Sequence, residues 1–193
     1  MRRRIIAGVV VGLVAALVVV LVVTRSGSSS KATTATTLNA NDPAVPAAGC
    51  VSDRQGDPAA DGGEARHTPP ASYKVDPPAG GNHDPVPAPA GFYQPGKAPT
   101  DGHIVHSQEH GYVVIWYHPD LPAAELAVLH QVFDAHAKDL LVVPRASMQK
   151  PVAATAWLSD DSRRRLLCDH AEAKTLSGFV ESFANKGPEA IPH

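Results

Sequence analysis

The chain has 193 residues, with 17 lysines and arginines against 19 aspartates and glutamates, and a formal net charge of -2. A nucleic-acid-binding surface needs an excess of basic side chains, so this balance argues against a nucleic-acid partner. The basic run Arg163 to Arg165 follows Asp160 and Asp161, and we interpret it as a solvated turn. Apolar residues are concentrated in an N-terminal block, so the part of the chain that can form a water-soluble core is shorter than the whole.

That block, residues 5–23, is a run of 19 residues without a charge. At 1.5 Å of rise per residue a helix of this length spans the hydrocarbon layer, which is about 30 Å thick. A cleaved signal peptide would have an apolar region of about 7 to 15 residues followed by a cleavage site between small residues. The sequence Thr24-Arg25-Ser26-Gly27 does not match such a site. The block therefore predicts one uncleaved transmembrane helix in contact with the lipid bilayer.

The charges on either side of residues 5–23 predict the orientation of the chain. Arg2, Arg3 and Arg4 precede the block, whereas only Arg25 and Lys31 follow closely. Positively charged flanks stay in the cytoplasm, so residues 1–4 are expected inside and the rest of the chain outside. We expect a single-pass membrane protein with an extracytoplasmic C-terminal domain.

Composition divides the chain beyond the predicted anchor. Residues 24–48 are rich in Ser, Thr and Ala and have no hydrophobic period, which predicts a disordered tether. Residues 49–190 are expected to form the extracytoplasmic domain. Within it, residues 49–100 are rich in proline, which lacks a donor N–H and disfavours helix before it, and they are predicted to be coil. The sheet and the helices are expected in residues 101–190.

The first regular elements of that region are a strand and a helix. Residues 112–117 read YVVIWY, β-branched and aromatic, between Gly111 and His118-Pro119, which predicts a buried strand. Pro122 suits the first turn of a helix. Apolar residues of this predicted helix recur at spacings of three, four and seven and form one face: Leu126, Leu129, Val132, Phe133 and Leu140.

Two more strands and a helix follow. Residues 140–143 predict a strand ended by Pro144, and residues 152–158 predict another, whose end at residues 159–161 resembles a turn into a helix. The last helix has an apolar face and ends before Gly187-Pro188; the face consists of Leu176, Phe179, Val180 and Phe183. The order β-α-β-β-α predicts an α+β fold with a small mixed sheet. Its first two strands should be parallel through a right-handed crossover, with the third antiparallel.

Two cysteines, Cys50 and Cys168, lie in the part of the chain expected outside the membrane. An even cysteine count in an oxidising compartment favours a disulfide. A disulfide between them would close a loop of more than about a hundred residues and would stabilise the fold by about 4 to 5 kcal/mol in the chain-entropy model. Two unrelated thiols are the alternative.

Ten histidines are present, and four of them, His103, His106, His110 and His118, surround the first predicted strand. His83 lies upstream in the proline-rich segment. Imidazole and carboxylate together suit Zn²⁺ or Cu(II). On a helical turn His106 and His110 would share one face about 5 to 6 Å apart, whereas on a strand they would be about 13 Å apart. The sequence leaves these two geometries open.

Residues 106–110 also match H-x-x-E-H, the inverted zinc-peptidase motif, in which Glu109 would be the general base. That motif needs a full helix and a further carboxylate ligand, but here it runs into a strand. Glu109 is thus the single candidate catalytic residue, and no reaction is predicted. In a second interpretation, the histidines bond backbone carbonyls and fix a loop against the coil.

Two stretches resemble a bacterial family catalogued as domain of unknown function 3105. Val105 to Gly111, followed by VVIWY, is similar to the family's V-H-S-L-E-H-G and strand. Residues 77–83 are similar to its P-P-T-S-G-P-H, and residues 91–93 and 187–189 also fit. The resemblance covers about residues 65 to 190. Gln108 stands where leucine is usual, and residues 80–82 replace Ser-Gly-Pro.

The resemblance implies a membrane-anchored, outward-facing protein, but no reaction. It also implies a ligand list, because His83, His106, Glu109 and His110 match the family's motifs while two of the other histidines, His103 and His118, do not.

Three functional hypotheses follow. The first is an extracytoplasmic domain that binds a divalent metal, Zn²⁺ or Cu(II), or a small polar ligand, through His83, His106 and His110, with Glu109 as a ligand or outer partner. The second is a non-enzymatic envelope interaction module with structural histidines. The third is a metal-dependent hydrolase with Glu109 as base. Met148 is the only methionine besides Met1, which argues against a methionine-rich Cu(I) carrier.

Overall fold

The computed structural model describes residues 49–58, 67–70 and 72–191. The predicted anchor at residues 5–23 and the predicted tether at residues 24–48 lie outside the described residues. In the ranges just given, none of the helices has the length and apolar character needed to span a bilayer. The anchor and the tether therefore stay predictions.

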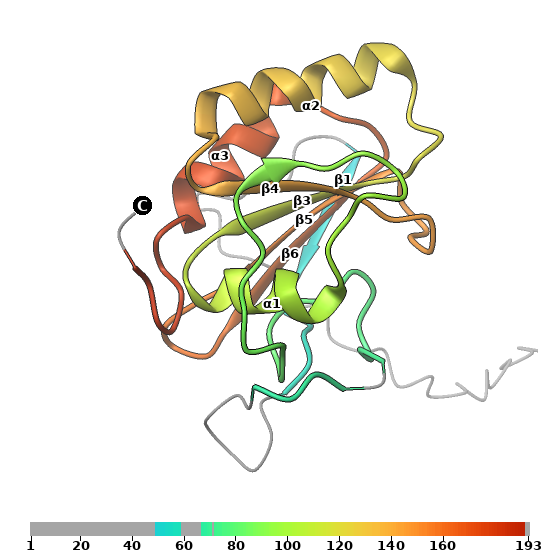
Figure 1. Cartoon of the computed structure of the whole chain (residues 1–193). Coiled ribbons are helices and arrows are strands. Elements are labelled where there is room, and N and C mark those ends of the chain that lie inside the picture. Colours follow the sequence, from blue (N-terminus) through green and yellow to red (C-terminus); the bar gives the residue numbers. More distant parts are fainter. Residues whose placement is uncertain (1–48, 59–66, 71, 192–193) are drawn as a thin grey trace, which may run out of the picture. The chain divides into compact units, whose positions relative to one another are not determined.

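A mixed six-stranded sheet and three helices form the described domain (Figure 1), which confirms the α+β class. The strands lie in the order β1-β6-β5-β3-β4-β2. Their bounds are β1 Cys50–Asp53, β2 Gly91–Phe92, β3 Val113–Tyr117, β4 Leu140–Pro144, β5 Val152–Trp157 and β6 Arg163–Cys168. The helices are α1 Asp101–Glu109, α2 Ala123–His136 and α3 Ala173–Phe183.

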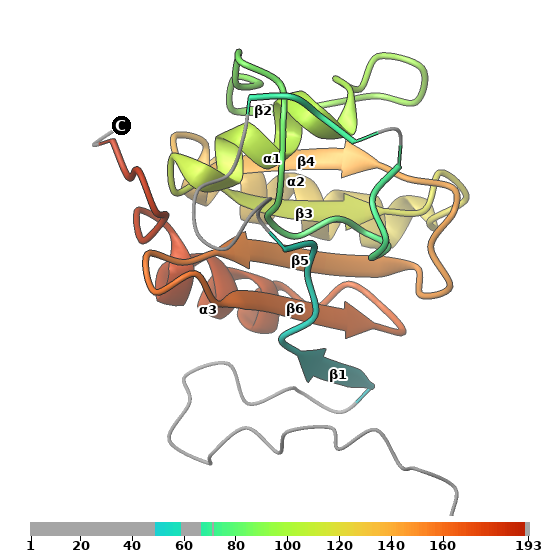
Figure 2. The same ribbon diagram turned by 90° about the horizontal axis from the view of Figure 1, so that it is seen from below.

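Both faces of the sheet are covered. Helices α2 and α3 lie on one face, and α1 with the neighbouring coil lies on the other (Figures 1 and 2). Successive side chains of a strand point to opposite faces, so Ile115 of β3 packs with Leu129 of α2, and Trp116 packs with Ile104 of α1. Because both faces are covered, all five β3 residues are buried. Burial on both faces explains why the sequence of this strand is an unbroken apolar run.

The predicted order of elements is present, with further elements around it. Strands β3 and β4 are parallel and joined through α2, as predicted. Strand β5 pairs antiparallel with β3, so it lies in the middle of the sheet. The chain also contains β1, β2, α1 and β6, which the predicted order does not include.

The interpretation of residues 159–165 as a turn into a helix and a solvated basic run was wrong. The chain returns as β6, antiparallel to β5, and Arg163 and Arg165 are only 8% and 5% exposed. Arg165 donates to both carboxylate oxygens of Asp53 in β1, at 3.0 and 3.2 Å. Arg163 pairs with nearby Asp161, whereas Arg165 is neutralised by a distant segment, a partner that local sequence does not reveal.

The proline-rich segment contributes both edge strands. Strand β1 pairs antiparallel with β6, and β2 pairs parallel with β4. Cys50 lies opposite Cys168 in this register, and the two form a disulfide, in agreement with the sequence prediction. The segment before α1 is thereby joined covalently to the sheet.

Candidate metal centre

The last turn of α1 carries two of the predicted ligands and sets the position of a third. Helix α1 has 9 residues, ends at Glu109, and is capped by His110. Gly111 follows with a φ of +94°, a left-handed conformation that glycine adopts without strain, and its N–H donates to the Gln108 carbonyl. His106 and His110 therefore lie one turn apart, with ring centroids 4.6 Å apart and Nε2 atoms at 2.7 Å. The helical geometry that the sequence left open is the one present.

His83 reaches the same place from the coil. Gly80 and Gly81 precede it with φ values of +72° and +103°, which form a tight loop. Buried Gln108 holds this loop, because its Oε1 accepts from the Gly80 N–H at 2.9 Å and its Nε2 donates to the Pro78 carbonyl at 3.2 Å. Gln108 thus positions a candidate ligand.

Four side chains converge beside α1. The Nε2 atom of His83 lies 3.0 Å from Glu109 Oε2, and that of His106 lies 4.0 Å from the same oxygen. The His67 ring is 4.9 Å from the His83 ring and 5.0 Å from the His106 ring, between centroids. One ligand atom from each of His67, His83, His106 and Glu109 lies within 4.8 Å of the others. We call these four residues the inner group, which could hold a metal ion.

Backbone carbonyls fix the tautomers of three of the histidines. The Nδ1 atoms of His83, His106 and His110 face the carbonyl oxygens of Gly81 at 2.9 Å, Asp84 at 2.6 Å and Glu189 at 3.1 Å. Since a carbonyl only accepts, each Nδ1 carries the proton. A neutral ring then presents the lone pair of Nε2 to the cluster, as metal-ligating histidines do.

The electrostatics of the inner group favour a cation. Burial would raise the pKa of Glu109, but His83, His106 and His67 together hold the pKa of its carboxyl below the usual value. Burial lowers the pKa of His106, and neighbouring His83 and His110 add to this. Burial opposes protonation of His83, yet the facing Glu109 carboxylate and the Gly81 carbonyl outweigh it and raise the pKa of His83. A charged carboxylate therefore faces a neutral His106.

Two atoms of the inner group are buried without a hydrogen bond. The His83 Nε2 and Glu109 Oε2 atoms are shielded from solvent, and neither has a hydrogen-bond partner among the described residues. They lie 3.0 Å apart, and they form an ion pair when His83 carries a proton on Nε2. An uncompensated buried polar atom costs about 1 to 3 kcal/mol. A cation between the two atoms would compensate both.

A second set of possible ligands adjoins the inner group. One ligand atom from each of Glu109, His110 and Glu189 also lies within 4.8 Å of the others. The segment after α3 brings Glu189 there, since its N–H donates to the Glu109 carbonyl at 2.9 Å. Gly187 allows this approach, because a Cβ at that position would lie 2.2 Å from the Glu109 carbonyl oxygen. We call Glu109, His110 and Glu189 the outer group.

The four residues named from the sequence all lie at this site, but in two groups. His83, His106 and Glu109 belong to the inner group, while His110 belongs to the outer one with Glu109. Sequence reasoning missed His67, which lies in coil before Pro69-Pro70 and has no periodic pattern around it.

The two other histidines near β3 make separate contacts. The Nδ1 atom of His103 lies 2.6 Å from the Val86 carbonyl, and its side chain is 37% exposed. The Nδ1 atom of His118 lies 3.6 Å from Asp120. Neither histidine belongs to the inner or outer group.

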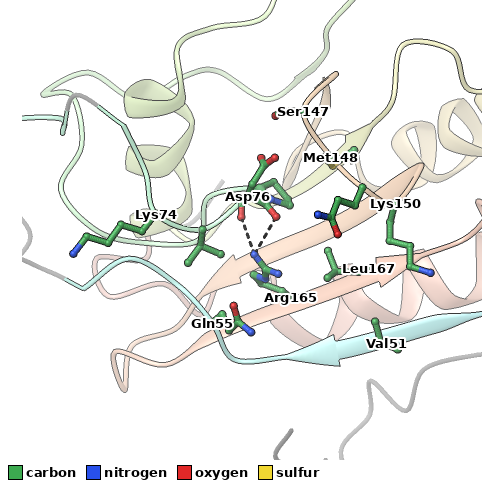
Figure 3. A pocket seen from close by; sticks show the side chains of 12 residues that line it. Val51, Gln55, Lys74, Asp76, Ser147, Met148, Lys150, Arg165 and Leu167 are labelled. Atoms are coloured by element: carbon green, nitrogen blue, oxygen red, sulfur yellow. Dashed lines mark hydrogen bonds between the residues drawn. The ribbon is translucent and has the colours of Figure 1, made fainter. Parts of the chain in front are cut away.

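A separate hollow of about 450 Å³ lies over β1 and β6 (Figure 3). Residues 74–77 and 147–150 form its walls, and no residue of the inner or outer group lines it. Arg165 in its lining already donates to the carbonyls of Asp76 and Pro77. The hollow is therefore not part of the candidate metal centre.

Comparison with known proteins gives one match. Neither the curated proteins nor the solved structures contain a significant match to this chain. Residues 66–192 match the family described as protein of unknown function (DUF3105). That range contains every residue of the inner and outer groups. The chain therefore belongs to the DUF3105 family.

Proposed function

We propose that this protein is a metal-binding domain that holds one divalent ion, Zn²⁺ in preference to Cu(II), through His67, His83, His106 and Glu109. The observation that carries the proposal is the buried pair of His83 Nε2 and Glu109 Oε2, which face each other at 3.0 Å and have no other hydrogen-bond partner among the described residues. Three imidazoles and one carboxylate are a ligand set that Zn²⁺ accepts in tetrahedral geometry, whereas Cu(II) prefers a tetragonal arrangement.

A purely structural role for the histidines explains the cluster less well. His106 and His110 both use Nδ1 as a donor, so their Nε2 atoms, 2.7 Å apart, would oppose two lone pairs if both rings were neutral. A proton on the half-buried His110 would relieve this, and so would a cation at the lone pair of either ring. A bound cation would also satisfy the Nε2 lone pair of the buried His106, which supports the metal hypothesis.

The position of Glu109 supports a ligand role over that of a general base. Its Oε2 lies among the ligand atoms, 3.0 Å from His83 Nε2 and 4.0 Å from His106 Nε2. A general base must instead be free to take a proton from a metal-bound water. We therefore propose binding, and no reaction.

We further propose that the domain acts outside the cytoplasmic membrane, on a tether behind the helix at residues 5–23. The uncharged run of 19 residues and the arginines before it support this location. The disulfide between Cys50 and Cys168 supports it independently, because such bonds persist in oxidising compartments.

Zinc analysis of the purified 193-residue chain tests the proposal. We expect tight binding that thermal unfolding detects as stabilisation, about 2.7 kcal/mol at a free ion concentration 100 times the dissociation constant. His83→Gln, His106→Gln and Glu109→Gln should each weaken binding by more than the roughly 10- to 100-fold that the loss of an outer partner costs, because each removes a ligand.

His103→Gln is the matched control. This histidine is also in α1 and also faces a backbone carbonyl through Nδ1, but it lies outside the inner group. Its substitution should leave zinc affinity unchanged. A metal-free chain whose unfolding does not respond to zinc or to chelator would contradict the proposal.

A further inference from the structure

We propose that the outer group, Glu109, His110 and Glu189, is a second divalent cation position, so that the Glu109 carboxylate bridges two ions. This inference rests on the proposed function, because the first ion occupies the inner group. Glu109 is the residue that the two groups share. A carboxylate can bind one ion through each oxygen, and ions in two-metal sites lie about 3.5 to 4 Å apart.

The two histidines at the end of α1 are placed to serve different ions. His106 belongs to the inner group and His110 to the outer group, with their Nε2 atoms 2.7 Å apart. The Nδ1 atom of His110 is committed to the Glu189 carbonyl at 3.1 Å, so Nε2 is the atom left for a metal. Two adjacent ions would give each of these Nε2 lone pairs its own partner.

Backbone contacts hold Glu189 where the second ion needs it. Its N–H donates to the Glu109 carbonyl at 2.9 Å, and its own carbonyl accepts from His110 Nδ1. The two residues that Glu189 contacts through its backbone, Glu109 and His110, are therefore also proposed ligands of the second ion. Gly187, which passes against the Glu109 carbonyl without a side chain, keeps this segment close to the end of α1.

The second position differs from the first in exposure and in ligand number. Glu189 is exposed and His110 is half-buried, whereas three of the four inner ligands are buried. Three protein ligands leave at least one coordination site of a divalent ion for water or an exogenous anion. We infer a weaker and more exchangeable ion at this position, with two carboxylates to offset its charge.

A chelator-competition titration of the 193-residue chain with Zn²⁺ tests the inference. Two equivalents are expected, the second bound more weakly. His110→Gln and Glu189→Gln should each remove the second equivalent and leave the first bound. Glu181→Gln, an exposed glutamate of α3, is the control and should retain both equivalents. With Co²⁺ in place of zinc, the loaded protein should show magnetic coupling that Glu189→Gln abolishes.

The outcomes separate the two proposals. A single equivalent that His110→Gln also removes would overturn the second position and make His110 a ligand of one ion, with the proposed function intact. A second equivalent that survives both substitutions would overturn the inference as well, because the ion would lie elsewhere. No binding at all would overturn the proposed function itself.

Discussion

Gln108 links the centre of the fold to the candidate metal centre. Its Nε2 donates to Thr155 Oγ1 of β5 at 2.9 Å, and Trp116 of β3 donates to the same hydroxyl at 2.8 Å. On its other side Gln108 bonds both Gly80 and Pro78. Both amide atoms of Gln108 therefore have hydrogen-bond partners, and this buried network holds the His83 loop against the sheet in a defined geometry.

Gln108→Leu should weaken zinc binding. The Gly80 N–H would lose its buried acceptor, which costs about 1 to 3 kcal/mol, and the His83 loop would be held less firmly. Because outer partners of metal ligands typically contribute a factor of about 10 to 100 in affinity, we expect a loss in that range. Chelator competition and urea unfolding measure the two effects. The exposed Gln149→Leu is the control, and unchanged affinity in Gln108→Leu would exclude the positioning role.

At the scale of single elements, the start of α3 depends on one carboxylate. Glu172 is its N-cap, and its side chain accepts from the N–H groups of Lys174 at 3.2 Å and Thr175 at 2.7 Å. The Thr175 hydroxyl donates to it as well. These hydrogen bonds from Thr175 hold the pKa of Glu172 below its usual value.

Glu172→Ala should lower the free energy of unfolding by about 1 kcal/mol near neutral pH, the usual effect of a lost cap. Since the pKa of Glu172 is lower in the folded state, its contribution is present above the unfolded value and is lost as pH falls through the folded one. The difference between the two proteins should therefore shrink on acidification. Urea unfolding at pH 7 and near pH 3 measures it. Glu181→Ala on the same helix should show no pH-dependent loss of stability. If the stability difference caused by Glu172→Ala did not change with pH, the N-cap role of the Glu172 carboxylate would be contradicted.

At the scale of the whole molecule, the disulfide joins residues 118 positions apart and fastens the edge strand β1 to β6. Replacing both cysteines by serine should destabilise the fold by about 4 to 5 kcal/mol in the chain-entropy model. Urea unfolding with and without reductant measures this, and the double serine variant should be insensitive to reductant. Equal midpoints for the intact and reduced protein would contradict the expected contribution.

The predicted location is tested on cells that make the whole chain. We expect the protein to stay in the membrane fraction after alkaline extraction, because residues 5–23 would span the bilayer. A variant without residues 2–25 should be found in the soluble fraction. A membrane-impermeant amine label should reach lysines of the C-terminal domain in intact cells. Extraction of the full chain by alkali, or labelling only after lysis, would refute the predicted anchor or its orientation.

By itself the sequence determined the parts of the fold that depend on local pattern. The apolar run of β3 and the helical periodicity of α3 follow from which of their positions are buried, and the order of apolar residues within each segment shows this. The cysteine pair was predictable from number and compartment. The motif around His106 and the one ending at His83 named most of the candidate ligands before any geometry was known.

Only the tertiary structure decided features whose partners are distant along the chain. Strand β6 can bury Arg165 because the Asp53 carboxylate neutralises its charge and the carbonyls of residues 76 and 77 accept hydrogen bonds from it. His67 and Glu189 join the candidate site through coil segments that carry no periodic signal. The division of the ligands into an inner and an outer group depends on distances between side chains from four separate segments, and these exist only once the sheet has assembled.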